Sequence, residues 1–79
     1  MLLAAIGYTQ LNLGDLNAAL NSLEASVQLN PQAAISWYHL ATAQSASNQI
    51  NEAKESLKMA LQLQPNFQAA KVLLNQLEN

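Results

Sequence analysis

His39 is the single histidine of the chain and the first candidate for chemistry. An imidazole can act as a general base or a metal ligand, but both roles need partner groups. The chain has no cysteine, and no carboxylate lies one helical turn from His39 along the sequence. We therefore interpret His39 as a partly exposed helix residue and predict neither a metal site nor a bound cofactor.

Glu52 and Glu55 are the next candidates, because paired carboxylates can share acid and base roles. Two lysines lie beside them, and acidic side chains near the start of a helix also stabilise the helix dipole. This pattern favours a solvated helix face. Ser45 and Ser47 have no base nearby and are interpreted as loop serines. Because no nucleophile has an activating partner, we predict that the protein is not an enzyme.

The charge of the chain restricts its partners. Charged residues make up 10% of the 79 residues, and the net charge is −2. Phosphate backbones and anionic membrane surfaces are bound through several basic side chains, so we expect neither a nucleic acid nor a membrane as partner. Two glycines cannot form a glycine-rich phosphate loop. The absence of cysteine fits both the cytoplasm and the bacterial periplasm, so the compartment stays open.

The first six residues form an apolar run, Met1 to Ile6. No basic residue precedes this run and no cleavage-like segment follows it, which argues against a signal peptide. The run is also far shorter than the roughly 20 residues of a membrane span. We interpret it as the start of a buried helix, with a signal peptide as the alternative.

The candidate residues belong to a sequence that repeats every 34 residues. Pro31 and Pro65 are separated by this distance, and similar short phrases surround them. Further pairs at the same offset are Gln10 and Gln44, Asn17 and Asn51, Ala19 and Ala53, Ser22 and Ser56, Leu23 and Leu57, Gln28 and Gln62, and Leu29 and Leu63. So many matches in one register indicate two copies of one structural unit.

Each copy is predicted to contain two helices. In the first copy, one helix covers 2–12, and a second begins at Leu16 after Gly14 as a left-handed C-cap and Asp15 as an N-cap. The second helix ends at Asn30, because the residue before proline avoids the α region. Pro31 is expected to open the next helix, with Asn30 as its cap.

The second copy follows the same plan. Its first helix contains Trp37, and the weak helix stretch 45–49 places Asn48 where Gly14 stands in the first copy. A fourth helix starts at Ile50. After the break around Pro65, a fifth helix is expected from about Phe67 to Glu78. Because no alternating strand pattern occurs, the sequence predicts an all-α fold.

This pattern resembles the tetratricopeptide repeat, a helix-turn-helix unit of 34 residues. The family favours Trp, Leu, Gly and Tyr on its first helix. The second unit has Trp37, Leu40 and Ala41 at these positions, with Gln44 in place of the tyrosine. The first unit has Leu3, Ile6, Gly7 and Gln10 there. The two glutamines are expected to weaken two packing contacts, and Trp37 is expected in the core rather than stacked on a ligand.

The family's second helix favours a small residue, a large apolar residue, another small residue and a proline. These positions hold Ala19, Leu23, Ser26 and Pro31 in the first unit, and Ala53, Leu57, Ala60 and Pro65 in the second. The resemblance implies an α-α superhelix of two antiparallel hairpins and a closing helix. We expect repeat 1 over 1–33, repeat 2 over 34–67 and the capping helix over 67–78, as part of a longer array.

The two ends of this array are expected to differ. The fifth helix has Lys71, Asn75 and Glu78 at positions that would face a further repeat, which is typical of a polar capping face. Leu2 lies on the side that an earlier repeat would cover. We interpret residue 1 as a cut in a longer array or as part of a self-association face.

The resemblance implies a protein-interaction module that binds a peptide or a helix in a concave groove lined by the first helix of each unit. Carried over to this sequence, the groove contains Ala4, Tyr8, Leu11, Asn12, Ile35, Tyr38, His39, Thr42, Ser45, Ala69, Val72 and Gln76. These residues are uncharged, so we expect a neutral or apolar ligand and no affinity for acidic C-terminal peptides. The alternative is a structural unit that forms homo-oligomers through its N-terminal end face.

Overall fold

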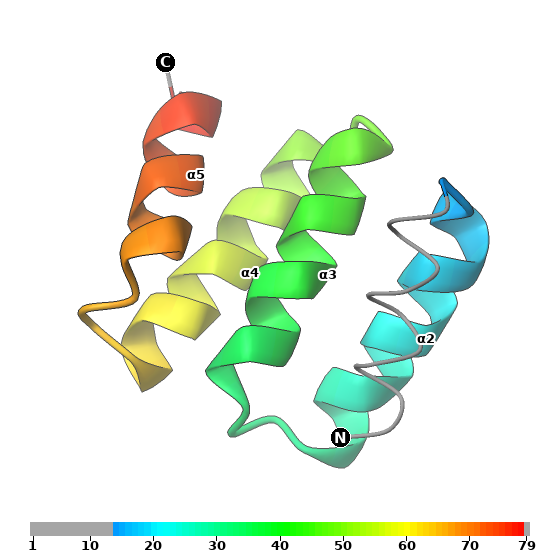
Figure 1. Cartoon of the computed structure of the whole chain (residues 1–79), viewed down its shortest axis with the longest axis horizontal. Helices are drawn as coiled ribbons and strands as arrows, with labels where there is room; N and C mark the ends of the chain where they lie inside the picture. The colour runs from blue at the N-terminus through cyan, green and yellow to red at the C-terminus, as the bar shows by residue number, and fades with distance from the viewer. Residues whose placement is uncertain (1–13, 79) are drawn as a thin grey trace.

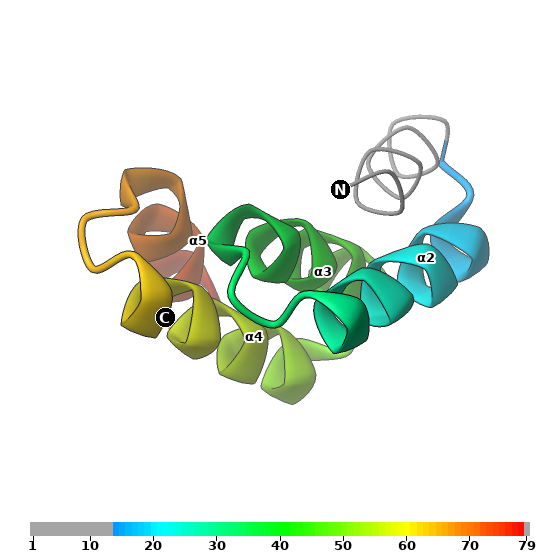
Figure 2. The same ribbon diagram turned by 90° about the horizontal axis from the view of Figure 1, so that it is seen from below.

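In a computed structural model, the structure describes residues 14–78. The described helices are α2 (Leu16–Leu29), α3 (Ala34–Ala46), α4 (Ile50–Leu63) and α5 (Gln68–Glu78). Within 14–78 there is no strand, so the all-α prediction is confirmed for this range, whereas the helix predicted over 2–12 lies outside it. Consecutive helices run side by side (Figure 1), with α3 and α5 on one side and α2 and α4 on the other (Figure 2). None of the four has the length and hydropathy to cross a membrane.

The start of α2 has the predicted local structure. Gly14 has φ +83°, in the left-handed region that glycine adopts without strain. The Asp15 carboxylate then accepts a hydrogen bond of 3.3 Å from the backbone N–H of Ala18. This bond satisfies one of the free N–H groups at the helix N-terminus, which is the role expected of an N-cap.

The connection between α3 and α4 corrects one expectation. Ser45 was expected in a loop, but α3 continues to Ala46. Asn48 takes φ +64°, and the chain closes the helix with the N–H of Gln49 donating to the Gln44 carbonyl at 2.8 Å. The N–H of Asn48 donates to Ser45 at 3.1 Å, which completes a Schellman motif. Asn48 therefore fills the left-handed position that Gly14 fills earlier, as predicted.

The expected start of the third helix was wrong. Pro31 does not open α3, which begins at Ala34. The N–H of Asn30 still bonds to Ser26 of α2 at 2.9 Å, so Asn30 ends one helix instead of capping the next. The carbonyl of Ala33 accepts the first bonds of α3.

The equivalent residue 34 positions later, Phe67, plays the same part before α5. Its carbonyl accepts the N–H of Lys71 at 3.1 Å, so α5 begins at Gln68 and not at Phe67. Both first helices of the described range therefore start three residues after their proline, through a carbonyl rather than a side-chain cap.

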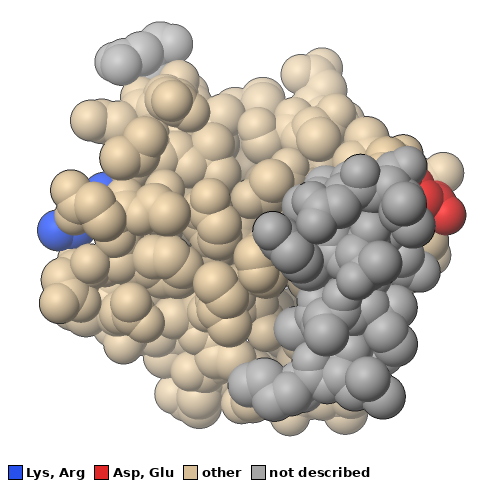
Figure 3. Space-filling view, viewed as in Figure 1, with Lys and Arg blue, Asp and Glu red and all other residues tan. Residues whose placement is uncertain are grey.

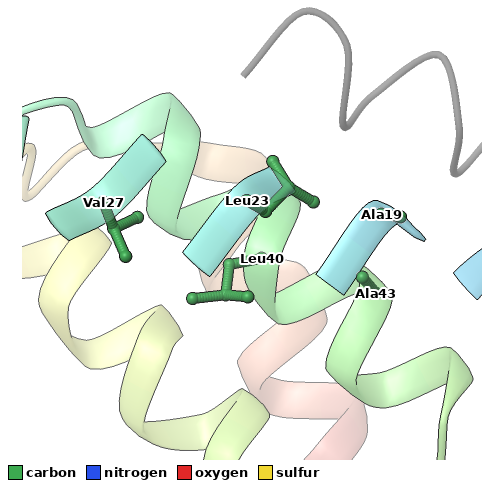
Figure 4. Packing of buried hydrophobic residues seen from close by; sticks show 5 residues of the cluster. All are labelled: Ala19, Leu23, Val27, Leu40 and Ala43. Carbon is green, nitrogen blue, oxygen red and sulfur yellow. The ribbon is translucent and has the colours of Figure 1, made fainter. Parts of the chain in front are cut away.

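Two clusters of buried side chains hold the helices together. The first, between α2 and α3, contains Ala19, Leu23, Val27, Leu40 and Ala43 (Figure 4). The second, around α4, contains Ala41, Ala53, Leu57, Ala60 and Ala70. Leu23 and Leu57 are fully buried at equivalent positions of the two repeats, and each contributes about 1.5–3 kcal/mol by leaving water. The alanines around them allow the close helix crossings that the repeat pattern predicts.

Trp37 joins the two clusters. Its ring is partly buried and packs against both, and its Nε1–H donates to the Pro31 carbonyl at 2.9 Å. This hydrogen bond ties α3 to the turn that precedes it. The structure therefore places Trp37 in the core, as the sequence predicts.

Two buried hydrogen bonds cross the helix interfaces. Ser26 of α2 donates to Ser36 of α3 at 3.2 Å, and Ser56 of α4 donates to Gln44 Oε1 of α3 at 2.7 Å. Gln44 was expected to weaken the packing, yet it is buried and satisfied, because Ser56 supplies a donor at that place. Among the described residues, no buried side-chain polar atom lacks a partner.

Candidate interaction surface

The predicted binding residues of α3 share one side of the helix, because residues three, four and seven positions apart lie above one another. These are Ile35, Tyr38, His39 and Thr42. Ile35 is 44% exposed, and the other three are half-buried. Ser45 follows on the last turn and is also half-buried. The structure thus brings these five residues together on one helix.

Tyr38 lies at the centre of a small aromatic group. Its ring centroid is 5.6 Å from that of His39 and 5.2 Å from that of Phe67, with tilted planes in both cases. Phe67 immediately precedes α5, so the Tyr38 ring connects the surface of α3 to the start of the next repeat. Tilted aromatic pairs at this distance are favourable beyond the area that they bury.

The polar groups near Tyr38 are partly committed. The Thr42 hydroxyl donates to the Tyr38 carbonyl at 3.0 Å, one turn back along α3. Partial burial lowers the pKa of His39 from its usual 6.5, since the charged imidazolium loses water. His39 is therefore mostly neutral at pH 7, and this side of α3 carries no full charge.

Helix α5 supplies the remaining predicted residue. Val72 is 51% exposed and stands 34 residues after Tyr38, so it occupies the same place on α5 that Tyr38 occupies on α3. Ala69 and Gln76 are exposed on the same side of α5. We call the combined surface the α3–α5 face, which comprises Ile35, Tyr38, His39, Thr42, Ser45, Ala69, Val72 and Gln76. Figure 2 shows α3 and α5 on the same side of the molecule.

The α3–α5 face lacks charge. All Lys, Asp and Glu residues of the chain lie outside α3, and those of α5 are Lys71 and Glu78, which do not belong to the face. In the space-filling view from the side of α3 and α5 (Figure 3), charged atoms are seen at the edges of the molecule and not over its middle. A ligand on this face therefore meets apolar, aromatic and neutral polar groups.

Some predicted residues lie outside the described part of the chain. Tyr8, Leu11 and Asn12 of the predicted groove belong to 1–13, as does Leu2 of the predicted end face. Phe67, in contrast, was missed as a neighbour of Tyr38. Its position one residue before α5, equivalent to Ala33 before α3, was the available signal.

The candidates for chemistry are dispersed. Glu52 and Glu55 are exposed on α4, while His39 lies on α3. Within 14–78, no group of three or more His, Cys, Asp or Glu side chains is placed to hold a metal ion. The described side chains thus offer a surface for contact.

Comparison with known proteins gives the same picture as the helix register. A sequence model of the tetratricopeptide repeat matches residues 10–77, most of the chain. No curated protein matches it. Tetratricopeptide repeats typically mediate protein–protein interaction and are generally non-enzymatic scaffolds. With its 34-residue register, its alternating helices and this match, the chain belongs to the tetratricopeptide repeat family.

Proposed function

We propose that the protein binds a neutral or apolar segment of a partner protein on the α3–α5 face. The observation that carries this proposal is the absence of charge on α3 combined with two exposed aliphatic side chains, Ile35 and Val72, on neighbouring first helices. Large apolar side chains exposed together on a folded surface are typical of interaction sites.

Tyr38 supports this proposal. A tyrosine offers a large contact area with few rotatable bonds, so little conformational entropy is lost when a ligand covers it. Its contact with Phe67 holds the ring in place before any ligand arrives. A pre-organised aromatic side chain flanked by two exposed aliphatic ones is suited to be the centre of a small binding site.

The same surface argues against acidic C-terminal peptides as ligands. A carboxylate needs charged or bidentate donors to offset the loss of its water. At the positions where some relatives in the family hold such a carboxylate, this chain has Ala4, Tyr8, His39, Ala69 and Leu73. None of them carries a permanent positive charge.

The test is a selection from a displayed library of random 16-residue peptides against the whole chain. The proposal expects enriched peptides that lack net charge and that lose at least tenfold in affinity when Tyr38 is changed to Ala in a variant of unchanged helicity. Enrichment of acidic peptides, or equal binding to Tyr38→Ala, would contradict it.

Self-association through an end face that includes Leu2 is the alternative proposal. Sedimentation over a range of concentrations separates the two. A monomer that binds the enriched peptides supports the interaction module, whereas a mass that rises with concentration and falls in Leu2→Glu supports self-association.

A further inference from the structure

We infer that the segment bound on the α3–α5 face is an amphipathic α-helix and not an extended peptide. This inference rests on the proposed function and specifies the conformation of the partner. It is carried by the kind of hydrogen-bonding groups that the face offers and by where they lie along α3 and α5.

One half of the face has no side-chain polar atom. Ile35, Ala69 and Val72 lie in the N-terminal halves of their helices, and all three are exposed. An extended peptide has unpaired N–H and C=O groups along its whole length, and those covered by aliphatic side chains lose water without gaining a partner. This half of the face therefore disfavours an extended backbone.

The other half offers few donors. The Thr42 hydroxyl proton is directed at the Tyr38 carbonyl of its own helix. Ser45 and Gln76 lie toward the C-terminal ends of α3 and α5, beyond the reach of a segment placed over the aliphatic half. Within the described part of this face there is no Asn, Lys or Arg to bind backbone carbonyls.

An α-helix meets these conditions. Its backbone groups bond within the helix, so it needs only an apolar stripe to replace water on the partner. Ile35, Tyr38 and Val72 provide apolar contact on two neighbouring helices, which suits anchors spaced three, four or seven residues apart. The absence of charge on α3 then selects a helix whose contacting side is uncharged.

The experiment uses the peptides enriched from the random 16-residue library on the whole chain. The inference expects apolar residues at three- and four-residue spacing, and sequential amide–amide contacts along the bound peptide in NMR spectra of the complex. A proline substituted in the middle of the peptide should weaken binding at least tenfold, since it breaks a helix. Alternating apolar residues, an extended bound form and tolerance of the proline would overturn the inference.

Matched variants separate failure of this inference from failure of the proposed function. Ile35→Gln and Val72→Gln each replace an exposed aliphatic residue of the face, and Leu29→Gln replaces one on α2 that is 77% exposed. Loss of at least tenfold for the first two with Leu29→Gln unchanged places the peptide on the face, whatever its conformation. Equal affinity for all three variants would overturn both the proposed function and the inference.

Discussion

Helices α3 and α5 occupy equivalent places in successive repeats, yet only one of their edges differs. On α3 the packing edge carries Trp37, Ala41 and Gln44, all wholly or partly buried. The equivalent residues of α5 are Lys71, Asn75 and Glu78, all exposed. The expectation of a polar edge on the fifth helix agrees with these exposures.

The other edge of the two helices keeps its character. Ile35 and Tyr38 of α3 are replaced on α5 by Ala69 and Val72, with no charge in either helix. Charge enters α5 only where no described helix packs against it. The neutrality of the α3–α5 face is thus not a by-product of burial, because the exposed residues of α5 keep it too.

The largest expected difference between the two packing edges concerns Trp37. Trp37→Ala removes a ring that packs against both core clusters and a hydrogen bond to Pro31, and should lower the free energy of unfolding by about 3 kcal/mol. Lys71→Ala, at the equivalent position, should change it by no more than about 0.5 kcal/mol. Urea titration followed by circular dichroism measures both. Similar losses in the two variants would show that the edges do not differ in packing.

A smaller difference is expected for the buried hydrogen bond of α3. Ser56→Ala leaves the buried Gln44 oxygen without a donor and should cost about 2 kcal/mol of stability. The double variant Gln44→Leu with Ser56→Ala removes both polar groups and should recover most of that loss. Glu78→Ala, at the equivalent position on α5, should have almost no effect. Additive losses in the double variant would mean that the two side chains act independently.

The smallest effect involves His39, whose counterpart on α5 is Leu73. Because burial lowers the pKa of His39 in the folded chain below 6.5, folding favours the neutral imidazole. Stability from this source is complete above pH 6.5 and is lost as the pH falls through the lower pKa of the folded state. Urea unfolding at several pH values should show this loss in the natural chain and a weaker one in His39→Gln. Identical profiles would remove His39 as the cause.

The sequence predicts most of the fold because its signals are local or periodic. Asn48 adopts the left-handed conformation that its match with Gly14 indicated, and Leu23 and Leu57 are buried as their register required. The start of α3 could not be predicted in this way. Ala33 caps that helix through its carbonyl alone, and this residue type carries no capping signal.

The partners of side chains were harder to predict than their faces. The repeated spacing of glutamine and serine was visible, but it did not show that Ser56 would donate to Gln44 twelve residues earlier. In the same way, helical spacing places Tyr38 on a surface, whereas its contact with Phe67 depends on how α5 approaches α3. Such contacts follow from the angle between helices, which periodicity does not specify.

The central claim is that the neutral edge of α5 binds a partner and the charged edge does not. The most direct measurement compares Val72→Lys with Asn75→Lys in calorimetry with one uncharged peptide enriched from the library. Both variants add the same charge to an exposed site of one helix. The account predicts that Val72→Lys weakens binding at least tenfold, about 1.4 kcal/mol, while Asn75→Lys stays within twofold of the natural chain. Equal affinities, or a larger loss in Asn75→Lys, would contradict the claim.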